Sequence, residues 1–113
     1  MICKNIENKE IIFVWYDGEH ELIAPEYLFY NDDVLCGGFS FYEPTKMFHQ
    51  VCIFPHMQNK GLGTQMMREA VELFPNGDLA LKTVSDIALR VYTKVGFEIE
   101  YEGCGTYQMI YRR

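Results

Sequence analysis

Apolar residues in the first half of the chain fall into short β-branched and aromatic runs that turn residues separate. These runs are Ile11–Tyr16, Tyr27–Tyr30, Val34–Tyr42 and Met47–Phe54. Runs of this kind predict strands, and Asp17-Gly18 after the first run predicts a hairpin turn. The pair Gly37-Gly38 inside the third run indicates a bulge or the close approach of another backbone.

The spacing of apolar residues changes after residue 61. Leu62, Met66, Ala70 and Leu73 recur at helical spacing, and the turn residues 75–78 end this predicted helix. The elements expected next are a strand at 79–84, a short helix that Ser85 or Asp86 caps and Gly96 ends, and an antiparallel pair at 97–101 and 107–111. This order predicts an α+β fold with a mixed, mostly antiparallel twisted sheet and flanking helices.

Length and composition are typical of a single domain that spans residues 1–113. Hydrophobic residues make up 49% of the chain, yet no stretch approaches the ~20 apolar residues of a membrane helix. The first residues lack the apolar region of a signal peptide, so we expect a cytoplasmic protein without a membrane partner. The net charge of −6 argues against a nucleic-acid partner.

The excess of negative charge lies in the first half of the chain. Residues 1–57 contain nine acidic and three basic side chains, whereas residues 58–113 contain seven of each. Two interpretations remain open. The acids belong to ordinary solvated loops, or they create a negative field that attracts a cationic substrate.

The four cysteines are widely spaced, at Cys3, Cys36, Cys52 and Cys104. They include no Cys-x-x-Cys pair, so we expect no zinc site. Three of them lie in or near apolar runs, which predicts buried free thiols.

The segment Gln58–Thr64 is the strongest candidate for a binding site. It follows the fourth apolar run, and Gly61 and Gly63 stand where a helix begins. The first N–H groups of a helix lack partners inside it, and the helix dipole favours negative charge there, so this loop is predicted to bind phosphate. It is not a P-loop, because Thr64 replaces the lysine, and Met66 occupies the third glycine position of a dinucleotide fingerprint.

A second motif lies downstream, at Tyr92, Gly96 and Phe97. Together with Gln58 and the two loop glycines, it makes the chain resemble the GNAT family of N-acetyltransferases. In that family a Gln/Arg-x-x-Gly-x-Gly/Ala loop leads into a helix, and a strand and a short helix ending in Tyr-x-x-x-Gly-Phe follow. The resemblance extends over residues 26–113 and implies a GNAT-like acyl-CoA N-acyltransferase fold.

The resemblance also implies an acetyl-CoA site. By position, the amides of residues 59–64 would bind the CoA pyrophosphate, and the end of the fourth strand would pair with the pantetheine arm. A bulge there would splay the fourth and fifth strands into a V, and Asp86 stands where the family usually has an Asn that contacts the cofactor. The expected cofactor-binding residues are Ile53, Phe54, Gln58, Asn59, Lys60, Gly61, Leu62, Gly63, Thr64, Asp86 and Tyr92.

Acetyl transfer to an amine needs a general acid, a donor for the oxyanion and a base. Tyr92 is the candidate acid, because a phenol stays protonated at neutral pH and can donate a hydrogen bond to the leaving thiolate. A backbone N–H around Phe54 is the candidate oxyanion donor. The base stays open among His49, Glu43, His20, His56 and a water molecule.

The front of the chain departs from the family, whose domains usually begin with a strand and two helices. The residues before 26 are predicted to form strand and turn, with one helical turn between Glu19 and Ala24. The acceptor side is therefore expected to be open, which fits either a large acceptor such as a protein or peptide amine, or a homodimer that completes the site. Phe13, Trp15 and Tyr16 indicate either a partner surface or a strand pair in the core.

The sequence thus predicts an acetyl-CoA-dependent N-acetyltransferase. It would transfer acetyl by direct attack of a primary amine, belonging to a cationic small molecule or to a protein or peptide. The alternative is a non-catalytic GNAT-fold module that binds acyl-CoA or a partner protein, and a third interpretation is an unrelated α+β interaction domain.

Overall fold

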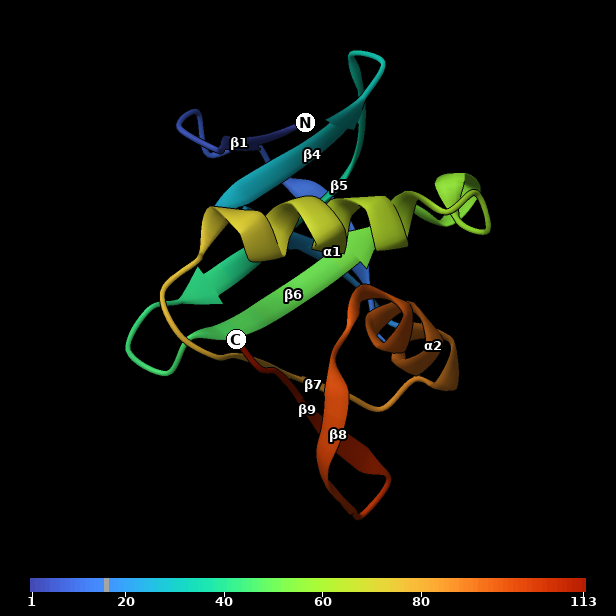
Figure 1. The fold of residues 1–113 in the computed structure, drawn as a ribbon. Coiled ribbons are helices and arrows are strands. Elements are labelled where there is room, and N and C mark those ends of the chain that lie inside the picture. The colour runs from blue at the N-terminus through green and yellow to red at the C-terminus, as the bar shows by residue number, and fades with distance from the viewer. Residues whose placement is uncertain (16) are drawn as a thin grey trace.

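The computed structural model describes residues 1–15 and 17–113, and these residues form two sheets and two α-helices (Figure 1). In chain order the elements are β1 (Ile2–Lys4), β2 (Ile11–Val14), β3 (His20–Ile23), β4 (Tyr27–Asn31), β5 (Val34–Tyr42), β6 (Met47–Ile53), the 3-10 turn η1 (Pro55–Met57), α1 (Leu62–Leu73), β7 (Leu79–Thr83), α2 (Asp86–Val95), β8 (Glu98–Gly103) and β9 (Thr106–Tyr111). The larger sheet has the order β1-β4-β5-β6-β7-β9-β8, and β2 and β3 form a separate hairpin. In the larger sheet the β6–β7 pairing is parallel and the others are antiparallel, which confirms the predicted α+β class.

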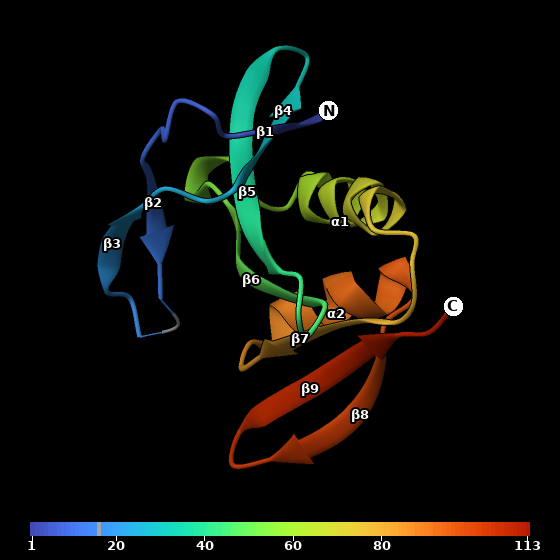
Figure 2. The same cartoon turned by 90° about the vertical axis from the view of Figure 1, so that its left-hand side faces the viewer.

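The helices and the hairpin lie on opposite faces of the β4–β5–β6 part of the sheet (Figure 2). The main core fills the space on the helix side, where Phe29, Phe39, Met66 and Met67 are fully buried. Leu62, Met66 and Ala70 of the predicted apolar stripe therefore lie on the face that α1 packs onto the sheet, whereas Leu73, also predicted to belong to it, is 46% exposed. None of the helices in the described parts of the chain is long and apolar enough to cross a membrane.

The front of the chain differs from the prediction. The expected helical turn between residues 19 and 24 is wrong, because His20–Ile23 forms β3 and pairs with β2. This pairing brings Ile11 and Ile23 together over Leu28, in a second apolar cluster under the hairpin, and a helical turn would not bury them. Strand β1 was not predicted, and Tyr16 lies outside the described residues.

The sheet separates along β6. Gly38 pairs with Cys52 and Ser40 with His49, so one residue of β5 opposes two residues of β6, and Gln50 in this bulge has φ 51°. Beyond the bulge β6 bends away from β7, and these strands pair only at Met47 and Ala80 in the described structure.

The glycine pair in β5 sits where two neighbouring strands come unusually close. A Cβ on Gly37 would lie 2.0 Å from the carbonyl oxygen of Cys52, and one on Gly38 would lie 2.4 Å from that of Tyr27. Both distances are far below van der Waals contact, so the predicted close approach of backbone is confirmed.

Helix α2 begins and ends at residues that the sequence identified. Ser85 rather than Asp86 is the N-cap, since its Oγ accepts a hydrogen bond from the Ala88 N–H at 3.2 Å. Gly96, with φ 121°, follows the last helical residue. The predicted C-terminal stop is thus confirmed.

The prediction of three buried thiols holds for Cys36 alone. Cys3 and Cys52 are half-buried and Cys104 is exposed, and all four cysteines are free. Cys52 differs from an ordinary core thiol because its strand borders the opening between β6 and β7.

Candidate functional site

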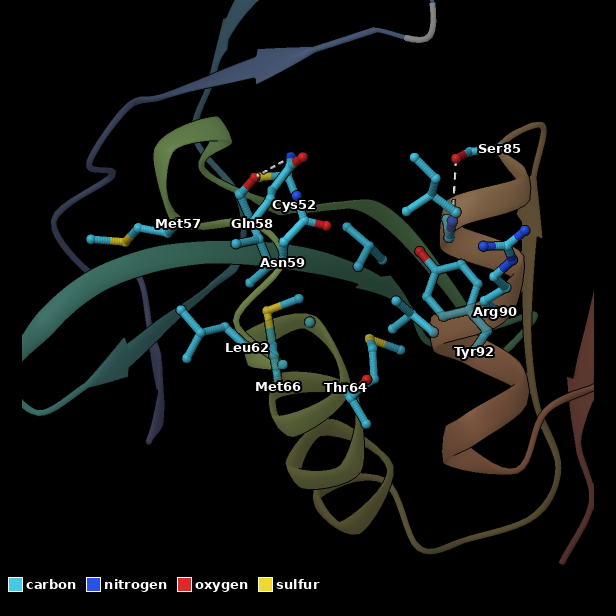
Figure 3. Close-up of a pocket in the computed structure, with 18 of the residues that line it drawn as sticks. Cys52, Met57, Gln58, Asn59, Leu62, Thr64, Met66, Ser85, Arg90 and Tyr92 are labelled. Atoms are coloured by element: carbon cyan, nitrogen blue, oxygen red, sulfur yellow. Dashed lines mark hydrogen bonds between the residues drawn. The ribbon is translucent and has the colours of Figure 1, made fainter.

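A cavity of about 640 Å³ lies where β6 leaves β7 (Figure 3). Four parts of the chain line it. They are residues 12–14 of β2, residues 51–53 of β6, the turn η1 with much of the glycine loop and the start of α1, and α2 with its N-cap Ser85. Segments far apart in the sequence therefore meet around one space, and most of the residues of the two sequence motifs face it.

The N-terminus of α1 supplies hydrogen-bond donors to this cavity. Gly61 is the N-cap with φ 77°, it offers no side-chain cap, and the first turn contains no acidic residue. The first N–H that bonds back to the Gly61 carbonyl belongs to Gln65, at 3.1 Å. The N–H groups of Leu62, Gly63 and Thr64 thus lack helical partners, and all three residues line the cavity.

The open edge of β6 forms a second wall. The Phe54 N–H donates to the Cys36 carbonyl at 2.8 Å, so it is occupied and cannot serve as the expected oxyanion donor. Successive residues of a strand direct their backbone groups to opposite edges, so the backbone groups of Ile53 face away from β5, toward the cavity. The Ile53 carbonyl accepts a hydrogen bond from Gln58 Nε2 at 3.0 Å, which ties the loop to the end of β6.

Tyr92 projects from α2 toward the interior of the cavity (Figure 3). Tyr92 is only 7% exposed, and its hydroxyl keeps contact with the open space of the cavity, because no fully buried side-chain oxygen among the described residues lacks a hydrogen-bond partner and no described group bonds this one. Burial raises the pKa of Tyr92 well above its ordinary value, and the neighbouring Cys52 raises it further. The phenol therefore stays protonated across the neutral range and can donate one hydrogen bond to a bound molecule.

Cys52 is a cavity residue that sequence reasoning missed. Burial raises the pKa of its thiol to about 11, against the opposing effect of a hydrogen bond from the Gly38 backbone. The thiol is therefore neutral at physiological pH. A cysteine inside an apolar strand looks like a core residue in sequence, and only the bulge and the separation of β6 from β7 reveal that it borders a cavity.

None of the four side chains proposed as bases lines the cavity. His49 and His20 are exposed on β6 and β3, and His56 stacks on the Phe54 ring with centroids 6.0 Å apart. Glu43 is exposed and forms an ion pair with Lys46, with Nζ and Oε1 2.9 Å apart. The sequence identified these groups as possible bases but could not show that all four side chains lie outside the cavity lining.

Three of the expected cofactor-binding residues also fall outside the lining. Phe54 packs toward the hairpin, Lys60 is exposed in the loop, and Asp86 accepts a long hydrogen bond of 3.5 Å from the Tyr107 hydroxyl. The other eight, Ile53, Gln58, Asn59, Gly61, Leu62, Gly63, Thr64 and Tyr92, are brought together. Arg90 and Lys94 of α2 line the cavity as well and are cations that no motif pointed to.

The β2–β3 hairpin borders the cavity, although the residues before 26 were expected to leave the acceptor side open. Residues 12–14 border the cavity, and Phe13 contacts Trp15 edge-on with ring centroids 4.8 Å apart. Phe13 is half-buried and Trp15 is 42% exposed, so the hairpin is part core and part surface. One chain therefore supplies a wall here, and a homodimer that completes the site stays a prediction.

A split mixed sheet with a glycine loop and an uncapped helix beside the split defines the fold of GNAT-like acyl-CoA N-acyltransferases. Residues 8–99 match the family model of the acetyltransferase (GNAT) domain, and the chain belongs to this family. The match begins well before residue 26, where the sequence resemblance was expected to start, and it includes the hairpin. A search of curated proteins gave no match.

Solved structures with the same fold come from archaea and bacteria. One is from Pyrococcus horikoshii OT3 (TM-score 0.62, 18% identity, covering 77% of this chain and 64% of that one). The PaiA N-acetyltransferase of Thermoplasma acidophilum in complex with coenzyme A has a TM-score of 0.64 and 16% identity, covering 77% of this chain and 59% of that one. A Bacillus subtilis acetyltransferase in complex with CoA has a TM-score of 0.63 and 19% identity, covering 77% and 75%. The chain thus spans less than two thirds of the first two.

Proposed function

We propose that this protein is an acetyl-CoA-dependent N-acetyltransferase that transfers acetyl to a primary amine by direct attack. One observation carries the proposal. A single cavity of about 640 Å³ joins an uncapped helix N-terminus, an open strand edge and the accessible hydroxyl of the largely buried Tyr92, which no group of the described residues hydrogen-bonds. These are the groups needed to hold a phosphate, to hold an extended amide-containing arm and to donate a proton. When bound, acetyl-CoA would supply the activated acetyl group.

The residues that line the cavity fit such a ligand in chemistry and in space. The N–H groups of Leu62, Gly63 and Thr64 and the positive end of the α1 dipole would hold the pyrophosphate. A side chain at residue 63 would fill this space, because a Cβ there would already touch Val91 at 3.6 Å and Ile53 at 3.7 Å. Arg90 and Lys94 add positive charge on the opposite wall.

Ile53 and Tyr92 take the roles closest to the reacting atoms. The backbone of Ile53 would pair with the amide-containing arm, in place of the occupied Phe54 N–H. Tyr92 holds its proton at the hydroxyl oxygen, where it would stabilise the negative charge that develops on a departing thiolate. Removal of the proton from the acceptor is assigned to water in the cavity. The acidic first half of the chain supports a cationic acceptor.

The second candidate function is a GNAT-fold module that binds acyl-CoA or a partner without turnover. The position of the four candidate bases outside the cavity lining favours it. An acyl-CoA-binding module shares cofactor binding with the enzyme, so turnover alone separates these two, whereas a partner-binding module does not require the cofactor.

The test combines calorimetry with a free-thiol release assay over a panel of amines. We expect CoA and acetyl-CoA to bind, and CoA to be released in an amine-dependent manner. Tyr92→Phe should leave the Kd for CoA within about threefold and lower kcat by about 10²- to 10³-fold, the usual range for a lost proton donor. Binding of CoA without its release in the presence of any amine would support the non-catalytic acyl-CoA module, and absence of binding would reject both the enzyme and that module and leave only a partner-binding module.

A further inference from the structure

The hairpin presents a strand edge, rather than one of its faces, to the cavity. Ile12, Phe13 and Val14 are consecutive, and all three line the cavity. Side chains of consecutive strand residues point to opposite faces, so three in a row can border one space only along the edge of the strand. The other edge of β2 is paired with β3. The edge that faces the cavity is thus the free one.

The backbone groups on this free edge can be assigned from the hairpin register. The Trp15 N–H donates to the Glu19 carbonyl at 2.8 Å, so these two residues form a hydrogen-bonded pair. Because hydrogen-bonded and non-hydrogen-bonded pairs alternate, Phe13 is bonded to Glu21, and the N–H and C=O groups of Ile12 and Val14 point away from β3. Donors and acceptors two residues apart on a free edge are what an extended polypeptide pairs with.

Charge selects the kind of polypeptide. Between residues 10 and 45 the chain has eight acidic residues and no lysine or arginine, and Asp17, Glu19 and Glu21 of the hairpin are all exposed. A second copy of this chain would bring the same acids to the edge and be repelled. A basic segment would be attracted instead.

The interior of the cavity selects the kind of amine. Burial raises the pKa values of Tyr92 and Cys52, so both groups keep their protons and neither takes one from an ammonium at neutral pH. A lysine side chain, with a pKa of about 10.4, would arrive almost entirely charged. An N-terminal amine, with a pKa of about 7.7–8.0, is partly neutral and needs no strong base.

We propose that the free edge of β2 docks the N-terminal segment of a basic polypeptide as an added strand and delivers its α-amine to the cavity. This inference rests on the acetyl transfer proposed above. The amine nitrogen forms a bond to the acetyl carbon, the bond between that carbon and sulfur breaks, and the electron pair leaves on the CoA sulfur. The nitrogen loses one proton to solvent, the sulfur gains one, and the products are the N-acetylated polypeptide and CoA.

Peptides with matched backbone changes test the docking edge directly. The substrate is a basic, extended eight-residue peptide with a free N-terminus, and its comparison is the amide of its first amino acid. We expect the peptide to give a kcat/KM at least about 10-fold above that of the amide, because paired backbone groups each contribute severalfold. In a series of peptides, each with a methyl group on the nitrogen of a different backbone amide, the effect on KM should alternate along the peptide. Methylation at every second position should raise KM about 5-fold.

Two proline variants of the hairpin form the matched pair on the protein side. Val14→Pro removes the edge N–H that faces the cavity, and Leu22→Pro removes one that faces the outer edge of β3. Neither residue forms a hydrogen bond between β2 and β3, and proline is tolerated where the N–H faces outward. Val14→Pro should raise the KM for the peptide about 5-fold with little change in kcat, whereas Leu22→Pro should not. Circular dichroism checks both folds, and if either variant unfolds the N-methyl series decides.

The outcomes separate the two levels of inference. Equal efficiency with peptide and amino-acid amide, or N-methyl effects without alternation, would overturn edge docking while acetyl transfer stands. If no acceptor causes CoA to be released from acetyl-CoA, both edge docking and acetyl transfer are overturned.

Discussion

Replacing Gly63 by aspartate tests the phosphate-binding role of the loop more sharply than any truncation. Gly63 lies in the first turn of α1 and lines the cavity, and a Cβ there would make ordinary contacts of 3.6 Å and 3.7 Å. A Cβ at this position is therefore accommodated without displacing its neighbours. A carboxylate in the first turn also interacts favourably with the helix dipole, so the fold should be at least as stable as that of the wild type.

The magnitude follows from Coulomb's law. A carboxylate about 6 Å from one phosphate charge, at an effective dielectric constant of about 20, costs about 3 kcal/mol, or about 100-fold in Kd. Gly63→Asn is the matched control, because asparagine has nearly the same shape and no charge. The comparison of Asp with Asn therefore isolates the electrostatic effect from the steric one.

Calorimetry with CoA, and with pantetheine, which lacks the pyrophosphate, provides the assay. The Asp variant should bind CoA about 100-fold more weakly than the Asn variant, and the ratio should shrink as salt is raised. Pantetheine should bind both equally. If Asp and Asn variants bind CoA within threefold of each other, the loop is only a turn at the start of a helix and the reasoning fails.

Two further predictions concern stability. The pKa values of Tyr92 and Cys52 are raised in the folded protein, so the folded state holds these protons more tightly than the unfolded state does. The stability that this difference provides is complete below the unfolded pKa values. It is lost as pH rises above about 9 for the thiol and about 10 for the phenol. Urea unfolding from pH 7 to 11 should show this loss, and Tyr92→Phe should flatten it, whereas an unchanged slope would contradict the burial argument. Arg113→Ala should lower the free energy of unfolding by about 1–2 kcal/mol, because its guanidinium donates to two carbonyls at the C-terminus of α1. Arg112→Ala, which removes only exposed ion pairs, should cost less than about 0.5 kcal/mol, and equal losses would contradict the capping role.

The sequence predicted the elements that carry strong local patterns. Neighbours within a few residues decide the period of Leu62, Met66 and Ala70, the cap of α2 and the stop at Gly96. The structure has the period and the stop where expected, and Ser85, one of the two predicted caps, is the N-cap. Two errors at the front have a different origin. Both β1 and β3 are short, and pairing with another strand, β4 for β1 and the neighbouring β2 for β3, stabilises them rather than their own composition.

In the candidate site, too, the features that local patterns decide were predicted, and those that depend on contacts between distant segments were not. Most of the motif residues lie on one cavity because local rules place them at the ends of neighbouring elements. The roles of Cys52 and residues 12–14 depend on a bulge and on the docking of a hairpin across the sheet, which no short-range pattern encodes. The histidines were misleading for the same reason, since a side chain's chemistry says nothing of the direction in which the fold turns it.

The single Met47–Ala80 pair between β6 and β7 has a thermodynamic consequence. Within the larger sheet, β1-β4-β5-β6 and β7-β9-β8 are two blocks with almost no backbone hydrogen bonds between them in the described structure. Such blocks can open independently, so native-state hydrogen exchange should resolve them as separate units. A ligand that fills the gap touches both, and at 100 times its Kd it would add about 2.7 kcal/mol to the stability of the whole. The bound molecule would thereby act as the missing strand that turns two cooperative units into one.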